Sequence, residues 1–168
     1  MKTKSIFERE LYFSFKRLGL VKKIWFSKFY DTPPLRRGNR IIYLPKNPFD
    51  FFCITENYFY GIEAKMIREK RFPFAMLPEH QEQNLIKFND VNEKTKAYIF
   101  INFKLLPEKN IAFAIDINKY LILKEKYMNE GLRGIPLESF ENDGFAIQLE
   151  RLRFDKNIYG WELKEVVK

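Results

Sequence analysis

Apolar and polar positions divide the chain into a short series of helices and strands. From about Lys4 to Leu18, apolar side chains recur at three- and four-residue spacing, which predicts an amphipathic helix that ends at Gly19. The segment from Val21 to Phe29 is rich in aromatic residues and predicts a strand. The chain is therefore expected to begin with a helix followed by a strand.

Two further apolar segments lie close enough together to form a hairpin. They are Asp50–Thr55 and Tyr58–Met66, separated only by Glu56-Asn57. The preceding stretch, from Asp31 to Pro48, contains four prolines and the turn signal Gly38-Asn39. Because proline interrupts helices and central strands alike, we expect a protruding loop or hairpin at about 31–48, with room for one short strand.

The second half of the chain continues with alternating helices and strands. The expected elements are a helix from Pro78 to about Lys87, buried strands at Ala97–Phe103 and Ile111–Ile117, and a helix capped by Asn118 that ends at Gly131. Gly144–Leu149 and Tyr159–Val166 are shorter apolar segments of either type. This order predicts an α/β sandwich around a central mixed sheet, in one domain spanning residues 1–168.

Composition adds a class of partner and removes several kinds of site. Thirty lysines and arginines against 22 acidic residues give a net charge of +8, which suits nucleic acid, although a lysine-rich solvated surface gives the same balance. The single cysteine, Cys53, excludes a disulfide framework and a CxxC zinc site, and the single histidine, His80, excludes a two-histidine metalloprotease helix. No apolar run approaches the ~20 residues of a membrane span and no signal-peptide core is visible, so we expect a cytoplasmic protein without membrane association.

Three residues of the expected hairpin have the chemistry of a phosphodiesterase site. Glu63 and Lys65 lie two apart in a strand and so project to the same face, and hairpin pairing can bring Asp50 beside them. Two converging carboxylates form a hard-oxygen site for Mg²⁺, which can polarise a phosphate and activate water. Lys65 would offset the charge that develops on that phosphate. A Glu-x-Lys pair is also common on solvated strands, so the upstream Asp50 is what favours the site.

These residues resemble the PD-(D/E)XK nuclease superfamily, which has a restriction-endonuclease-like fold. Over most of its length the chain resembles RecU-like Holliday-junction resolvases, and archaeal resolvases share the acidic residues and lysine. The matching words are Phe7-Glu8, Asp50, Ile62-Glu63-Ala64-Lys65, Phe72-Pro73-Phe74, His80-Gln81, Tyr98–Phe103, Ile135-Pro136 and Gly144–Ile147.

This resemblance implies a homodimeric, Mg²⁺-dependent endonuclease that acts on four-way DNA junctions by paired nicking in recombination and repair, with Mn²⁺ able to substitute. By the same resemblance Asp50, Glu63 and Gln81 match metal-binding positions, and Lys65 matches the transition-state stabiliser. Glu8 matches an acidic helix residue near the metal. A first-turn glutamate favoured by the helix dipole is an equal alternative for Glu8, and a solvated helix residue is one for Gln81.

The chain departs from the family pattern at two places. Pro48 stands where those resolvases have a hydroxyl-bearing residue, and the segment at 31–48 is shorter than their junction-entering stalk. That segment remains basic through Arg36, Arg37 and Arg40, which we expect to contact DNA. Two alternatives therefore stay open: a nuclease of the same type acting on flaps, nicked duplex or foreign DNA, and an inactive DNA-binding module.

Overall fold

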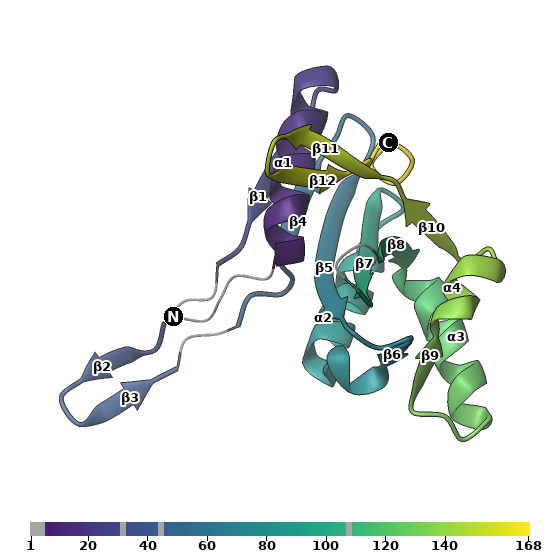
Figure 1. The fold of residues 1–168 in the computed structure, drawn as a ribbon. Coiled ribbons are helices and arrows are strands. Elements are labelled where there is room, and N and C mark those ends of the chain that lie inside the picture. Colours follow the sequence, from purple (N-terminus) through teal and green to yellow (C-terminus); the bar gives the residue numbers. More distant parts are fainter. Residues whose placement is uncertain (1–5, 31–32, 44–45, 107–108) are drawn as a thin grey trace.

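Helices lie on both faces of a six-stranded sheet in the computed structural model, which describes residues 6–30, 33–43, 46–106 and 109–168 (Figure 1). The strands are ordered β1-β4-β5-β7-β8-β10. β5 and β7 pair in parallel, and every other neighbouring pair is antiparallel. These strands are Trp25–Lys28 (β1), Phe51–Ile54 (β4), Phe59–Ile67 (β5), Thr95–Lys104 (β7), Asn110–Asp116 (β8) and Ala146–Leu149 (β10). The predicted α/β fold with a central mixed sheet is confirmed.

The remaining described elements are four α-helices, one 3-10 turn and three two-stranded sheets. The helices are α1 (Ile6–Val21), α2 (Glu79–Asn89), α3 (Ile117–Asn129) and α4 (Leu137–Asn142), and the 3-10 turn is η1 (Phe74–Met76). The small sheets pair β2 (Leu35–Arg37) with β3 (Arg40–Ile42), β6 (Arg71–Pro73) with β9 (Gly134–Pro136), and β11 (Arg151–Asp155) with β12 (Ile158–Trp161). None of the described helices has both the length and the apolar character that crossing a bilayer requires.

One face of the sheet is covered by α1 and by the C-terminal hairpin. The apolar stripe of α1 is buried against β4 and β5, and its members are Phe7, Leu11, Phe15 and Leu18. A buried polar network then fastens β12 to the helix. Glu10 accepts hydrogen bonds from Trp161 Nε1 at 3.0 Å and from Arg151 Nη2 at 2.8 Å, and Trp161 N donates to Ser14 Oγ at 2.7 Å. This network fixes the position of α1 and therefore of its first turn.

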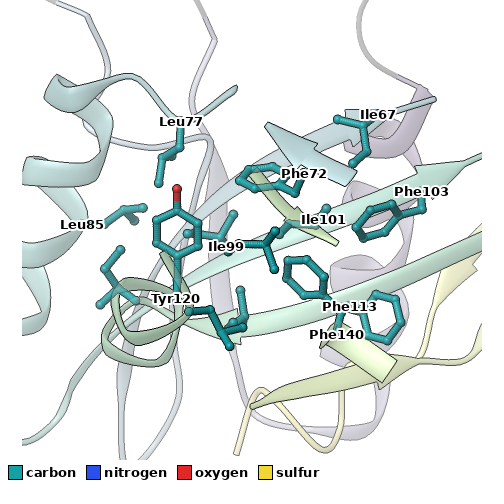
Figure 2. Packing of buried hydrophobic residues seen from close by; sticks show 14 of the residues in the cluster. Ile67, Phe72, Leu77, Leu85, Ile99, Ile101, Phe103, Phe113, Tyr120 and Phe140 are labelled. Atoms are coloured by element: carbon teal, nitrogen blue, oxygen red, sulfur yellow. The ribbon is translucent and has the colours of Figure 1, made fainter. Parts of the chain in front are cut away.

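The opposite face of the sheet holds the larger core, closed by α2, α3 and α4. Figure 2 shows the isoleucines of β7 packed among aromatic rings from β6, β8 and the helices, with Leu77 and Leu85 at one side. Phe103, Phe113 and Phe140 have ring centroids 5.4 to 6.0 Å apart, a spacing typical of favourable aromatic pairs. Because α2 connects β5 to its parallel neighbour β7, it must cross this face, and its first turn lies close to β5.

The predicted end of the first helix is wrong. α1 does not end at Gly19 but continues to Val21, and Lys22 N still donates to Leu18 O at 2.8 Å. Gly19 lacks the positive φ that ends a helix, so glycine permitted a stop here without imposing one. The predicted strand is correspondingly shorter, at Trp25–Lys28. The predicted helix start at Lys4 lies outside the described residues.

The cap of α3 is Asp116 instead of Asn118. The Asp116 carboxylate accepts a hydrogen bond from Asn118 N at 2.9 Å. Asn118, which was predicted to be the cap, therefore contributes only its backbone N–H to the capping bond. The predicted end of this helix is confirmed, because Gly131 has φ of +76° in the left-handed region. The predicted strands at 97–103 and 111–117, the helix from Pro78 and the hairpin at 50–66 are also confirmed.

Candidate active site

The site lies where β4 begins, beside the part of β5 that extends past β4. Phe51 pairs with Ile62, and Asp50, one residue earlier, donates its backbone N–H to Ile62 O at 3.0 Å. The Asp50 carboxylate then accepts a hydrogen bond from Ala64 N at 2.8 Å. The aspartate side chain thus satisfies a backbone donor that a longer β4 would have paired, and this bond holds Asp50 beside the next residues of β5.

Glu63 and Lys65 project from β5 to the face that α2 covers, as the two-residue spacing predicts. Lys65 Nζ lies 2.7 Å from Glu63 Oε1 and 2.8 Å from the Oε1 of Gln81, in the first turns of α2. Both charged side chains are largely withdrawn from solvent, with 2% of the Glu63 side chain and 13% of the Lys65 side chain exposed. Gln81 therefore orients the lysine in this structure, and a metal-binding role for Gln81 stays a prediction.

The two carboxylates are held in an environment that disfavours their charge. Burial is the largest cause that raises the pKa of Glu63, to about 7, followed by the neighbouring charge of Asp50; Lys65 acts in the opposite direction. Burial also raises the pKa of Asp50, with its bond to Ala64 N opposing the shift. One oxygen of Glu63, Oε2, is buried without a hydrogen-bond partner among the described residues. A buried carboxylate oxygen without a partner favours a cation as its missing ligand.

Glu8 reaches the same site from the other face of the sheet. It lies in the first turn of α1, and its charge raises the pKa of both Asp50 and Glu63. Its Oε2 lies 2.5 Å from the Nζ of Lys28 on β1. The structure therefore brings together Glu8, Asp50, Glu63, Lys65 and Gln81, which the sequence named.

Lys28 is the residue that sequence reasoning missed. Its side chain is only 6% exposed, and its charge lowers the pKa of Asp50. Alternation along the strand gave no reason to bury a lysine. The available signal was the aromatic residues near it in the sequence, at positions 25, 26, 29 and 30. In the structure its ammonium lies 5.4 Å and 5.6 Å from the ring centroids of Tyr30 and Phe51.

The three arginines of the predicted loop lie apart from the carboxylates. Arg36, Arg37 and Arg40 belong to the β2–β3 hairpin, which projects away from the main sheet in Figure 1, and all three are exposed. The turn uses Gly38 at φ of +60°, as the Gly-Asn signal predicts. Arg37 pairs directly with Arg40, and like charges opposite each other are unfavourable without an external anion. Residues 31, 32, 44 and 45 of the predicted loop lie outside the described residues.

The donor set fits Mg²⁺, although the protein alone does not enclose an ion. No three histidine, cysteine, aspartate or glutamate side chains of the described chain converge as a complete metal cage. Mg²⁺ does not require one, since it commonly binds through one or two carboxylates and keeps its remaining ligands for water and phosphate. Asp50 together with the unpartnered oxygen of Glu63 is such a set.

Comparison with known proteins places this arrangement in a family. A search of curated proteins gives no match. Among solved structures, the chain is similar to the 1.6 Å structure of Archaeoglobus fulgidus Hjc, a Holliday junction resolvase, with 17% identity and a TM-score of 0.45 over 69% of this chain and 78% of that one. The family model for recombination protein U matches residues 10–155, which is most of the sequence. The chain belongs to the recombination protein U family.

Proposed function

We propose that this protein is a Mg²⁺-dependent endodeoxyribonuclease that cuts four-way DNA junctions by paired nicking in recombination and repair. Membership in the recombination protein U family supports the nuclease class and the junction substrate. The observation that supports catalysis is the buried Glu63 carboxylate, which has one oxygen on Lys65 and the other without a partner, beside Asp50. A protein that only binds DNA would gain nothing from holding these carboxylates together, because the charge of Asp50 raises the pKa of Glu63.

Each residue of the site has a distinct task in this proposal. Asp50 and Glu63 would hold Mg²⁺, which when bound polarises a phosphate oxygen and lowers the pKa of water. Lys65, kept in place by Glu63 and Gln81, would offset the charge that develops on the phosphate in the transition state. Glu8 would add negative charge near the ion, and Lys28 would limit that charge by pairing with it.

The substrate proposal also requires two active sites. A four-way junction presents two equivalent strands related by a two-fold axis, so we propose a homodimer with the same symmetry. β7 and β8 lie inside the sheet and are covered on both faces, so they are not accessible to a second copy of the chain. The dimer interface must therefore lie on another part of the surface. Trp25, on the edge strand β1, is 58% exposed and packs against Phe52, so this edge offers an apolar side chain for the contact.

Cleavage of a four-way junction and a matched linear duplex, each with Mg²⁺, Mn²⁺, Ca²⁺ or EDTA, tests the proposal. We expect symmetric nicks in the junction with Mg²⁺ or Mn²⁺, and binding without cleavage in Ca²⁺. Asp50→Asn and Glu63→Gln should abolish cleavage while leaving DNA binding at or above the wild-type level, because each removes a negative charge that faces phosphate. Lys65→Ala should lose ~10²-fold or more in rate.

Two outcomes would contradict parts of this proposal. Full activity of Asp50→Asn would contradict the site assignment. Equal cutting of junction and duplex by the wild type would retain the nuclease but assign it to another substrate, such as flaps, nicked duplex or foreign DNA. The exposed triple variant Lys23→Gln, Lys156→Gln, Lys164→Gln is the control for nonspecific loss of positive charge, and it should retain wild-type cleavage.

A further inference from the structure

A cluster of exposed cations lies just beyond the site, at the end of the strand that holds it. β5 ends at Ile67, and within the next four residues Arg68, Lys70 and Arg71 are all exposed. Arg133 joins them from the segment that enters β9. We call these four residues the basic edge. They are distinct from the arginines of the β2–β3 hairpin, which projects elsewhere in Figure 1.

The backbone beneath the basic edge is held firmly, which distinguishes it from a mobile surface loop. Lys70 O accepts a hydrogen bond from Leu137 N at 2.9 Å, and Arg133 O accepts one from Phe74 N at 3.1 Å. Arg71 pairs with Pro136 in the β6–β9 sheet. A Cβ atom at position 134 would lie only 2.9 Å from Cγ of Arg71. Glycine at this position therefore leaves room for the aliphatic part of the Arg71 side chain. A fixed stem reduces the entropy that is lost when an anion binds.

No partner inside the described protein neutralises these charges. Glu69 and Glu138 are close in space, since they line a common surface hollow with Lys70 and Arg71. Nevertheless, none of the ion pairs formed by the described residues includes Arg68, Lys70, Arg71 or Arg133. Four cations beside these two glutamates leave an excess of positive charge on the surface, which suits an external polyanion.

The distance from the active site indicates which part of a DNA strand this surface would meet. Arg68 follows Lys65 by three positions, just past the end of β5, which is about 10 Å at the usual rise of a strand. Phosphates of one DNA strand are ~3.4 Å apart along the helix axis and further apart in space, because the strand winds around that axis, so a surface that begins here would meet phosphates within a few nucleotides of the cut. With Lys65 at the scissile phosphate, the basic edge would therefore meet the DNA a few nucleotides away.

We propose that the basic edge is a binding site for the sugar-phosphate backbone of the duplex arm that flanks the scissile phosphate, a few nucleotides from the cut. This inference rests on the proposed nuclease function and adds a site to it. Because backbone contacts position a duplex without reading its bases, the basic edge fixes where along the arm the cut falls and does not select a base sequence.

Two binding measurements on the full chain, made in Ca²⁺ so that the DNA stays intact, test this site. The variant Arg68→Gln, Lys70→Gln, Arg71→Gln should lower the slope of log K against log salt by roughly 2–3. The control variant Lys23→Gln, Lys156→Gln, Lys164→Gln removes the same charge near β11, β12 and the C-terminal residues, away from β6 in Figure 1, and should change the slope by less than about 1.

The second measurement locates the contact on the DNA. Uncharged methylphosphonate linkages placed three to five nucleotides from the cleavage position should weaken wild-type binding about 5-fold or more, and should have no effect on the basic-edge variant. If that variant keeps the wild-type slope, or the linkages weaken both proteins equally, the inference is overturned while the proposed function stands. If the wild type neither binds nor cuts DNA, the proposed function fails first. Equal melting temperatures would establish that the variants fold.

Discussion

At the scale of single residues, the main feature of the candidate site is the number of charged groups that lie close together. Three carboxylates and two ammonium groups lie near one another there, and the pKa values of Asp50 and Glu63 are raised by burial and changed further by these charged neighbours. The sequence showed which residue types were present and that Glu63 and Lys65 share a face. The burial of these charged side chains could not be predicted from the sequence. Neither could the ion pair of Glu8 with Lys28, because the two residues are 20 positions apart and belong to different elements.

The raised pKa of Glu63 predicts a pH-dependent stability. Below its ordinary value of 4.5, the carboxyl is protonated in both the folded and unfolded states. Between 4.5 and about 7 only the folded state keeps the proton, so the free energy of unfolding falls as pH rises, by up to about 3 kcal/mol. Chemical denaturation of the metal-free protein between pH 4.5 and 8 should show this decline in unfolding free energy, and Glu63→Gln should remove most of it. The same decline in both proteins would contradict the assignment. Mg²⁺ at pH 8 should restore stability to the wild type alone.

Lys28→Met should leave Glu8 without its cation, close to two other acids. We expect a loss of about 1–3 kcal/mol in unfolding free energy, and Glu8→Gln in the same chain should recover much of it. A double-mutant cycle by denaturant melts measures this coupling. Mg²⁺ should also raise the melting temperature of Lys28→Met more than that of the wild type, because the variant site has one more uncompensated negative charge. Additive effects of the two substitutions would exclude a functional ion pair.

At the scale of elements, long periodic segments were predictable and short ones were not. The hairpin at 50–66 and the strands at 97–103 and 111–117 follow from continuous apolar runs that only a sheet interior can bury. β6, β9 and α4 have three to six residues each, too few to show a period, and their formation depends on tertiary pairing between β6 and β9. The position of Gln81 against Lys65 depends in turn on how α2 crosses the sheet.

The β2–β3 hairpin has its own prediction. If Arg36, Arg37 and Arg40 contact phosphates, changing all three to glutamine should lower the salt slope of DNA binding by roughly 2–3 without altering sequence preference. The hairpin residues are exposed, so the melting temperature should not change. Combining these changes with those at the basic edge should lower the slope additively, because the two surfaces are separate. An unchanged slope in the hairpin variant would show that the β2–β3 hairpin is a solvated turn without DNA contacts.

At the scale of the whole molecule, the proposed junction chemistry predicts a stable homodimer in which each copy cuts one strand. Mixing wild-type and Asp50→Asn chains should give heterodimers that nick one strand and leave the junction unresolved. The wild-type dimer should bind a four-way junction at least ~10-fold more tightly than linear duplex, a difference of ~1.4 kcal/mol. Denaturing gels on strand-specific labels, with sedimentation at micromolar protein, measure both. A monomer, or resolution by the heterodimer, would contradict paired nicking.

The bond between Trp161 and Glu10 gives the molecule an internal optical probe. The chain has two tryptophans, and they lie in opposite surroundings: Trp161, on β12, is 1% exposed and bonded to α1, whereas Trp25 is 58% exposed at the sheet edge. Replacing Trp25 with phenylalanine would leave a single emitter, shielded from iodide and held by the helix whose first turn contains Glu8. Its emission would then report whether α1 shifts when metal or DNA reaches the first turn of that helix, on the timescale of a stopped-flow experiment.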